Sequence, residues 1–283
     1  MRLDRFNPAN IRVRGGGGGG LGGGAPLGCG AIVIAIVGAL VFGVDPGQML
    51  GTLQQVQQGA PTEQGPQGQS AEELCSANAY ATESCNALSS LNATWQPIFG
   101  QANVAFQQPE LVFYTGGTNS GCGAASSAMG PFYCPADQGI YIDTSFYDEM
   151  ARQLGAPGDF ARYYVMAHEY GHHVQRLTGT ADAVRREQQS NPSQANQLQV
   201  RMELQADCYA GVWAAKNRNL IEPGDFEEGM TAASAIGDDT LSGGRASPES
   251  FTHGTSAQRA EWLRRGLTSG NEDQCDTFAD LTR

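Results

Sequence analysis

The sequence predicts an α+β domain that is mostly helical in its second half and is preceded by one transmembrane helix. Three observations carry this prediction: an uncharged apolar run near the N-terminus, short β-rich runs before residue 143, and helix-like apolar spacing after residue 159. The 283 residues suffice for one sizeable domain but are too few for two domains with independent cores.

The N-terminal quarter of the chain predicts a membrane anchor. Residues 1–26 hold four arginines and a glycine run and are expected to form a disordered cytoplasmic tail. Residues 27–44 carry no charge and are just long enough to cross a bilayer as a helix. A cleaved signal peptide is the alternative, but its apolar region would be shorter and would precede a small-residue cleavage site.

The positions of the charges predict an orientation for this anchor. Because the arginines precede the apolar run, the positive-inside rule places the N-terminus in the cytoplasm. The chain is therefore expected to be a single-pass protein of the cytoplasmic membrane, with its catalytic domain outside the cytoplasm. Residues 45–70 are rich in Gln, Gly and Pro and predict a flexible linker, so the folded domain spans residues 71–283.

The net charge and the cysteines indicate which partners the protein can bind and in which compartment it folds. The formal net charge of -12 disfavours nucleic acid as a partner. Six cysteines lie in the predicted extracytoplasmic part, where disulfides are stable. Spacing suggests the pairs Cys75 with Cys85 and Cys122 with Cys134. Cys208 and Cys275 remain as a possible third pair, although connectivity cannot be deduced from sequence.

Local patterns give the order of the expected elements. The expected helices cover residues 72–99 in two pieces, 159–178, 187–218, 224–240 and 256–265, and the expected strands lie within residues 103–115 and 140–142. The strand at 140–142 could offer an edge to which an extended peptide adds. Residues 116–130 suggest a surface loop tethered by a disulfide, with a mobile flap as the alternative.

One helix carries the residues that indicate chemistry. Asp159 is expected to cap it, and within it lie His168, Glu169 and His172. Histidines four residues apart on a helix project from one face, so both imidazoles can reach one metal ion, with the glutamate beside them. The pattern occurs by chance in about one chain in a hundred of this length, so its surroundings must decide. The alternative is a helix whose histidines only pack or pair with carboxylates.

A second helix supplies the missing ligand. Hydrolytic zinc sites use three protein ligands and leave one position open. Glu203 can be the third ligand, and Asp207 can accept the second N–H of a ligand histidine and fix its orientation. Both could instead be solvated surface acids, but their apolar neighbours indicate a packed helix, where unpaired acids are costly.

These motifs occur within longer runs that resemble a known family. The chain is similar to the bacterial neutral zinc metallopeptidases, which belong among the zincins with a glutamate ligand. The resemblance covers nearly the whole chain and is carried by residues 130–135, 140–142, 168–173, 203–213 and 251–259, besides the Arg- and Gly-rich start. It implies a zincin-like metallopeptidase domain, with Zn²⁺ as cofactor.

The resemblance also implies a mechanism and candidate residues for it. Zinc would activate a water and polarise the scissile carbonyl, with Glu169 as general base. His253 is the leading candidate to stabilise the oxyanion, Arg259 could orient it or a neighbouring acid, and a structural role for His253 is the alternative. Tyr141 and Tyr209 are weaker candidates for this donor.

Two residues of the motif are expected to lie away from the metal. Tyr170 points elsewhere on the helix and is assigned to the core. His173 follows His172 by one position, leaves the ligand face and is expected either to pack or to support the ligands from behind.

The predicted function is a membrane-anchored zinc metallopeptidase acting on peptide or protein substrates. Two alternatives remain open at this point: a non-catalytic zincin-fold binding or scaffold protein, and a zinc amidase acting on a non-protein amide such as cell-wall peptide. Retention of Glu169 speaks against the first alternative, because metal binding alone does not need it. The sequence does not give the natural substrate or the oligomeric state.

Overall fold

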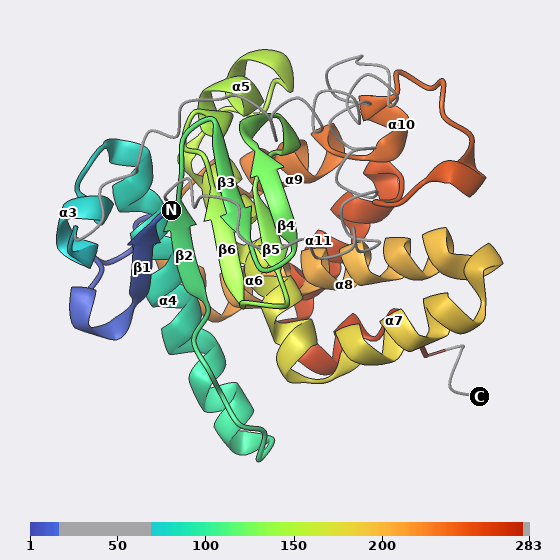
Figure 1. Cartoon of the computed structure of the whole chain (residues 1–283), viewed down its shortest axis with the longest axis horizontal. Helices are drawn as coiled ribbons and strands as arrows, with labels where there is room; N and C mark the ends of the chain where they lie inside the picture. The colour runs from blue at the N-terminus through green and yellow to red at the C-terminus, as the bar shows by residue number, and fades with distance from the viewer. Residues whose placement is uncertain (17–68, 280–283) are drawn as a thin grey trace.

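A four-stranded sheet lies beside the long helices in the computed structural model, which describes residues 1–16 and 69–279 (Figure 1). Its strand order is β1-β2-β6-β5; the first two pairings are parallel and the last is antiparallel. The strands are β1 (Arg12–Gly15), β2 (Glu110–Phe113), β5 (Phe132–Cys134) and β6 (Gly139–Ile142), and a separate hairpin consists of β3 (Gly117–Ser120) and β4 (Gly123–Ser126).

Both faces of this sheet are covered, as the period of a strand requires. Leu111 and Ile140 face the main core beside the helices, whereas the next residues, Val112 and Tyr141, face a smaller cluster shared with the hairpin β3–β4. In the strand order, β6 lies between β2 and β5. The prediction that residues 140–142 form an exposed edge is therefore wrong. The edge on that side is β5.

The predicted α+β class and the helical second half are confirmed. The helices are α3 (Ala71–Cys75), α4 (Ala79–Gln101), α5 (Phe146–Gln153), α6 (Asp159–Leu177), α7 (Thr180–Ser190), α8 (Ala195–Lys216), α9 (Asp225–Ala235), α10 (Asp238–Leu241) and α11 (Ser256–Ser269). The region expected as one helix over 187–218 is divided between α7 and α8. The break falls at Asn191–Pro192, since proline lacks the N–H that a continuing helix needs.

The three suggested disulfides are confirmed: Cys75–Cys85, Cys122–Cys134 and Cys208–Cys275. The first joins α3 to α4, the two pieces of the predicted first helix. The second tethers the hairpin β3–β4 to β5, in agreement with a disulfide-tethered loop over residues 116–130. The third fastens residue 275 to α8.

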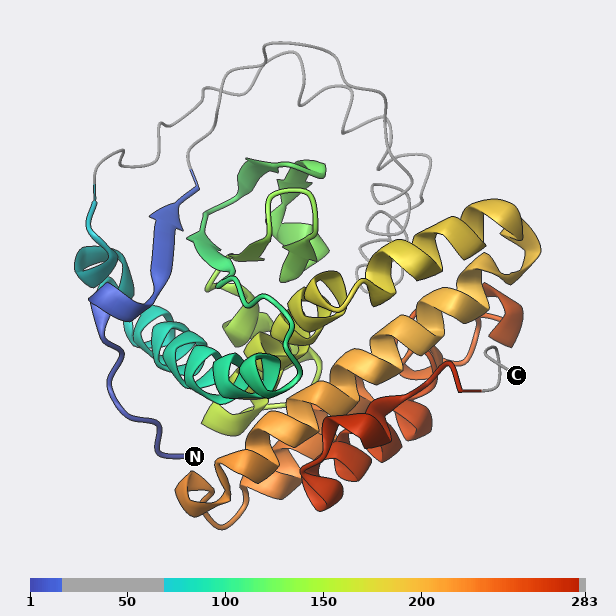
Figure 2. The same cartoon turned by 90° about the horizontal axis from the view of Figure 1, so that it is seen from below.

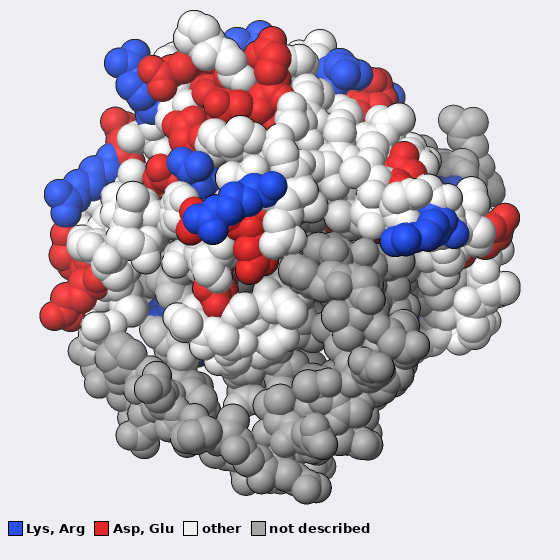
Figure 3. All heavy atoms as spheres, turned by 90° about the horizontal axis from the view of Figure 1, so that it is seen from above, with Lys and Arg blue, Asp and Glu red and all other residues white. Residues whose placement is uncertain are grey.

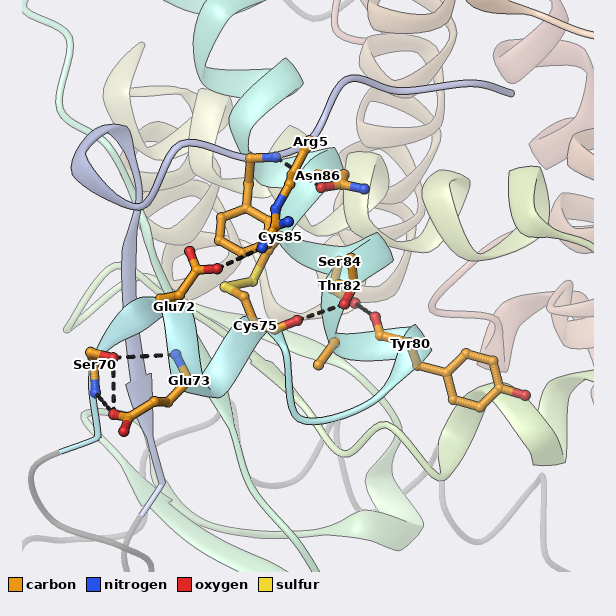
Figure 4. The surroundings of a disulfide bond; sticks show 12 residues. Arg5, Ser70, Glu72, Glu73, Cys75, Tyr80, Thr82, Ser84, Cys85 and Asn86 are labelled. Atoms are coloured by element: carbon orange, nitrogen blue, oxygen red, sulfur yellow. Dashed lines mark hydrogen bonds and ion pairs between the residues drawn. A yellow bond between two sulfur atoms is a disulfide. The ribbon is translucent and has the colours of Figure 1, made fainter.

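The N-terminal segment is part of this fold. Besides the pairing of β1 with β2, Phe6 and Ile11 are buried in the main core. Figure 4 shows the Arg5 guanidinium on the Glu72 carboxylate at 2.6 Å. The Phe6 amide donates to Asn86 Oδ1 at 2.9 Å. The prediction that residues 1–26 form a disordered tail is therefore wrong for residues 1–16.

The position of β1 also contradicts the predicted single-pass location. That topology puts residues 1–26 and residues 71–283 on opposite sides of a membrane. Because β1 is hydrogen-bonded to β2 in one sheet, the two segments lie on the same side, and the cytoplasmic-membrane assignment with an extracytoplasmic domain is wrong. Among the described residues no helix has the length and apolar character to cross a bilayer, while the expected span at 27–44 and most of the linker at 45–70 lie outside them.

The burial of the N-terminal segment predicts a stability effect. Phe6→Ala should lower the free energy of unfolding by about 3 kcal/mol, because it removes a buried aromatic ring. Asn10→Ala, at an exposed position of the same segment, should change it by less than about 0.5 kcal/mol. Urea unfolding followed by circular dichroism measures both. If Phe6→Ala were as stable as the parent, the N-terminal segment would not be packed on the core, and the prediction of a disordered tail would hold.

Candidate metal centre

Helix α6 carries the two histidines and the glutamate of the predicted motif. Its N-cap lies one residue earlier than expected: Gly158 takes that position, and the Asp159 carboxylate instead receives a hydrogen bond from the Met1 amine at 3.1 Å. Successive residues of a helix are rotated by about 100°, so His168 and His172 share a face and Glu169 lies beside it. His168 and Glu169 are buried among the core residues of α6.

Helix α8 crosses α6 at very close range at this point. A Cβ on Gly171 would lie 2.8 Å from Ala206 Cα, nearer than real contacts allow. A glycine inside the motif therefore lets the backbones approach. Figure 2 shows α8 running along the molecule with α11 beside it, and α8 contacts both α6 and α11. The approach brings side chains from positions 168 and 172 to those from position 203.

Three predicted ligands converge where the helices cross. Ligand atoms of His168, His172 and Glu203 all lie within 4.8 Å of one another. His168 Nε2 is 3.1 Å from Glu203 Oε2, and His172 Nε2 is 3.6 Å from Glu203 Oε1. Tetrahedral zinc at 2.0–2.1 Å separates two ligand atoms by about 3.3 Å. Two imidazole nitrogens and a carboxylate at these separations fit the ligand set of a hydrolytic zinc site.

His168 is held from behind by a buried ion pair. Its Nδ1 lies 2.8 Å from Asp207 Oδ1, the contact expected for a residue that orients a ligand histidine. Arg259, on α11, donates through Nε and Nη2 to the two oxygens of Asp207 at 2.9 and 3.0 Å. The Tyr164 hydroxyl donates to Asp207 Oδ1 at 2.6 Å. Arg259 thus acts on the neighbouring acid, one of its two expected roles, and not on His253.

The charges of this cluster shift the titration of its members. Burial alone would lower the pKa of His168, but the charge of Asp207 and hydrogen bonds to both carboxylates raise it to about 9. Burial would raise the pKa of Glu203, but the adjacent imidazoles, His172 foremost, hold it well below its usual range. Glu203 is therefore ionised at neutral pH, the state in which a carboxylate binds a metal.

Gln175 holds His172 from behind, and the sequence interpretation did not include it. His172 Nδ1 lies 2.9 Å from Gln175 Oε1. Gln175 is three residues further along α6, so the i, i+3 spacing on a helix face was the signal that could have revealed it. Both histidines therefore have an acceptor at Nδ1 and present Nε2 to Glu203.

Glu169 lies beside the ligands without joining their hydrogen bonds. Its carboxylate is close enough to His172 to contribute to the raised pKa of that imidazole, after the opposing effect of burial and the larger effect of Glu203. Glu169 is 8% exposed. It is thus a buried carboxylate beside the three converging residues and outside their hydrogen bonds.

The loop before α11 carries His253 and is organised by one acid. Asp238 Oδ2 accepts the amides of Thr252, His253 and Gly254 at 2.8, 2.7 and 3.0 Å. Asp238 Oδ1 lies 3.1 Å from His253 Nδ1, which leaves Nε2 as the other polar atom of the ring. His253 has no hydrogen bond to the three proposed ligands, but its charge contributes to the lowered pKa of Glu203, after the charge of His172 and the hydrogen bonds from His168 and His172. The sequence interpretation did not include Asp238.

The remaining candidates lie in the core or outside the site. The Tyr170 hydroxyl donates to Asn92 Oδ1, and the Tyr209 ring packs against Trp95, so both have core roles. Tyr141 donates to Asp137 on the far side of the sheet. His173 joins α6 to neighbouring segments: its Nε2 donates to the Gln107 carbonyl, its Nδ1 accepts from Tyr133, and burial lowers its pKa to about 4.

A surface depression of about 410 Å³ lies elsewhere, between α5, α9 and α10. None of the proposed ligands lines it, and its walls hold no titratable side chain. It offers no group for acid, base or metal chemistry, so the geometry at the crossing of α6 and α8 is the better guide to the active site. The depression is lined by Leu154, Met230, Thr231, Ser234, Ala235 and Thr240.

Comparisons with known proteins agree with the resemblance seen in the sequence. A family model described as "Putative neutral zinc metallopeptidase" matches residues 3–278. YpfJ of Escherichia coli strain K12 is 54% identical over 197 residues, covering 68% of this chain and 69% of the relative. Rv2575 of Mycobacterium tuberculosis strain H37Rv is 40% identical over 266 residues, covering 86% of each chain. Both relatives are named as uncharacterized proteins, and no solved structure matches the chain.

The buried ion pair predicts that two arginines of α11 contribute very differently to the free energy of unfolding. Arg259→Met should lower the free energy of unfolding by about 3–5 kcal/mol, because it leaves the Asp207 carboxylate buried without its main partner. Arg264→Met, which breaks the exposed pair with Glu261, should cost less than about 0.5 kcal/mol. Urea unfolding in the presence of a chelator measures both without a contribution from metal. Similar small effects would mean that Asp207 does not depend on Arg259 for compensation.

Proposed function

This chain belongs to the family of neutral zinc metallopeptidases, and on that premise we propose that it is a zinc-dependent hydrolase of peptide bonds. The observation that carries the proposal is the convergence of His168, His172 and Glu203 at zinc-ligand separations, with a carboxylate beside them that is not a ligand. Zinc bound there would polarise the scissile carbonyl and lower the pKa of the attacking water. Asp207 is the proposed positioning residue for His168.

Glu169 is the proposed general base. It accepts a proton from the attacking water and delivers it to the amine that leaves. Its place on α6 supports this role, because it lies next to His172 but outside the hydrogen bonds that orient the ligands. A protein that only bound metal would not need a desolvated carboxylate at this position.

His253 is the proposed donor to the oxygen that becomes negative in the transition state. Because Asp238 Oδ1 lies at Nδ1, Nε2 is the ring atom left to donate to a substrate oxygen. Burial would raise the pKa of Asp238, but hydrogen bonds from the His253 ring and from loop amides lower it, so the acid is ionised at neutral pH. The loop lies over α8, because η5 (Pro248–Ser250), just before it, contacts that helix.

The edge strand β5 supports a peptide as the substrate class. Its outer side is unpaired within the described sheet, and Tyr133 of this strand hydrogen-bonds to His173, next to the ligand His172. An extended chain can add to such an edge through its backbone groups.

On the face shown in Figure 3 acidic and basic side chains are interspersed, so that face offers no continuous basic surface for a nucleic acid.

Replacement of the proposed base should separate catalysis from metal binding. Glu169→Gln should retain one zinc per chain and lower kcat/KM on a peptide library about 10²–10⁴-fold, because only the proton acceptor is lost. His172→Ala should lose both zinc and activity. Glu187→Gln, at an exposed position of α7, is the matched control and should behave as the parent.

The outcomes of this assay discriminate between the functions. Zinc without hydrolysis of any peptide in the parent would favour a binding protein. Hydrolysis of cell-wall fragments but not of peptides would favour an amidase. A parent that binds no zinc would overturn the proposal.

The role of His253 predicts a kinetic effect confined to the chemical step. His253→Gln should lower kcat about 10²-fold while KM and zinc content stay within about threefold of the parent, because the donor acts on charge that develops in the transition state. Steady-state kinetics on the best library peptide measures the split. An increase in KM with an unchanged kcat would instead assign His253 to substrate binding.

A further inference from the structure

A line of hydrogen bonds leads from His172 away from the proposed zinc position. His172 Nδ1 lies 2.9 Å from Gln175 Oε1. Gln175 Nε2 donates to Gln205 Oε1 at 3.1 Å, and Gln205 Nε2 donates to the Cys275 carbonyl at 3.0 Å. Gln175, Gln205 and Cys275 are all buried. The line joins α6 through α8 to the C-terminal segment.

The backbone fixes the direction of every bond in this line. Gln175 Nε2 also lies 2.7 Å from the Met202 carbonyl, which can only accept. The amide nitrogen of Gln175 must therefore face α8, and its oxygen must face His172. The Cys275 carbonyl fixes the Gln205 amide in the same way. His172 must then carry its proton on Nδ1, which leaves the Nε2 lone pair for a metal.

The far end of the line is held by covalent and polar links. Cys275 forms a disulfide with Cys208, which lies on α8 three residues after Gln205. Two residues further on, the Thr277 hydroxyl donates to the Arg201 carbonyl at 2.8 Å. The acceptor at the end of the line therefore keeps a fixed position against α8. If it moved away, the buried Gln205 amide would lose its partner, and an unpaired buried donor is destabilising.

We propose that Gln175 and Gln205 are positioning residues for His172, through which the C-terminal segment held by Cys208–Cys275 fixes the tautomer and orientation of this zinc ligand. The proposal rests on the zinc site proposed above. The disulfide thus contributes to zinc affinity, although it lies outside the ligand set. A purely structural amide pair would join α6 to α8 but leave zinc affinity unchanged.

The zinc dissociation constant, measured by competition with a chromophoric chelator, tests the glutamines. Gln175→Leu should weaken zinc binding about 10–100-fold and Gln205→Leu about tenfold, as for other partners of ligand histidines. Gln175→Glu keeps an acceptor for Nδ1 but loses the donor to Met202 and Gln205, so it should bind zinc more tightly than Gln175→Leu and more weakly than the parent. Affinities of both leucine variants within threefold of the parent would overturn the proposal.

The two remote disulfides of the helices provide a matched comparison. Cys208→Ser with Cys275→Ser should weaken zinc binding about tenfold, whereas Cys75→Ser with Cys85→Ser, in the surroundings shown in Figure 4, should not change it. Adding Gln205→Leu to the first pair should cause no further loss, because both changes interrupt the same line. The proposal would be contradicted if removal of either disulfide weakened zinc binding equally, or if the losses from Gln205→Leu and from the first cysteine pair were additive.

A measurement on the parent protein tests the proposal even if some of these variants do not fold. Ring ¹⁵N shifts of the zinc-loaded protein, which has four histidines, distinguish a protonated Nδ1 from a coordinated one. His172 should show a protonated Nδ1 and a coordinated Nε2, and coordination through Nδ1 would overturn the proposal. If the parent binds no zinc, the proposed function itself fails. If it binds zinc with the leucine variants unaffected, only this inference fails.

Discussion

Burial of negative charge on α8 is the constraint on which the rest of the site depends. Glu203 and Asp207 lie one turn apart on the face that meets α6, and both are nearly inaccessible to solvent. A buried carboxylate is costly unless opposite charge and hydrogen bonds compensate for it. The partners come from two other helices: histidines on α6 and Arg259 on α11. A shift of any of these helices would leave charge unpaired, so the ion pairs that join them also fix the ligand positions.

Small residues allow the three helices to meet at this distance. Gly171 lies against Ala206 in the crossing of α6 and α8, and a Cβ on Gly211 would lie 2.2 Å from the Leu263 carbonyl oxygen on α11. Side chains of short reach, such as those of histidine and aspartate, can then contact one another across the helices. Close backbone packing and the polar cluster are thus two aspects of one arrangement, and the line through Gln175 and Gln205 extends it to the C-terminal segment.

The N-terminal segment shows where local sequence patterns are weakest. Residues 12–15 read Arg-Val-Arg-Gly, in which the alternation of charged and apolar residues is too short and the apolar content too low to indicate a strand. They form one because the parallel partner β2 lies about a hundred residues away and supplies the hydrogen bonds. Phe6 and Ile11 add buried apolar area against the helices. Pairing of this kind depends on distant residues, so composition alone assigned the segment to a disordered tail.

Sequence by itself determined the elements whose signals are local. The α+β class, the two pieces of the first helix, the two short-range cysteine pairs and the helical spacing of His168 and His172 follow from periodicity, capping and short separations along the chain. Glu203 was proposed as the third ligand because a zinc site requires one and the sequence around Glu203 indicated a packed helix. Only the tertiary structure decided that β1 joins the sheet, that β5 is its edge, and that Arg259 and Gln175 hold the two histidines. These depend on which surfaces meet in space, because hydrogen bonds and ion pairs between distant segments leave no periodic pattern along the chain.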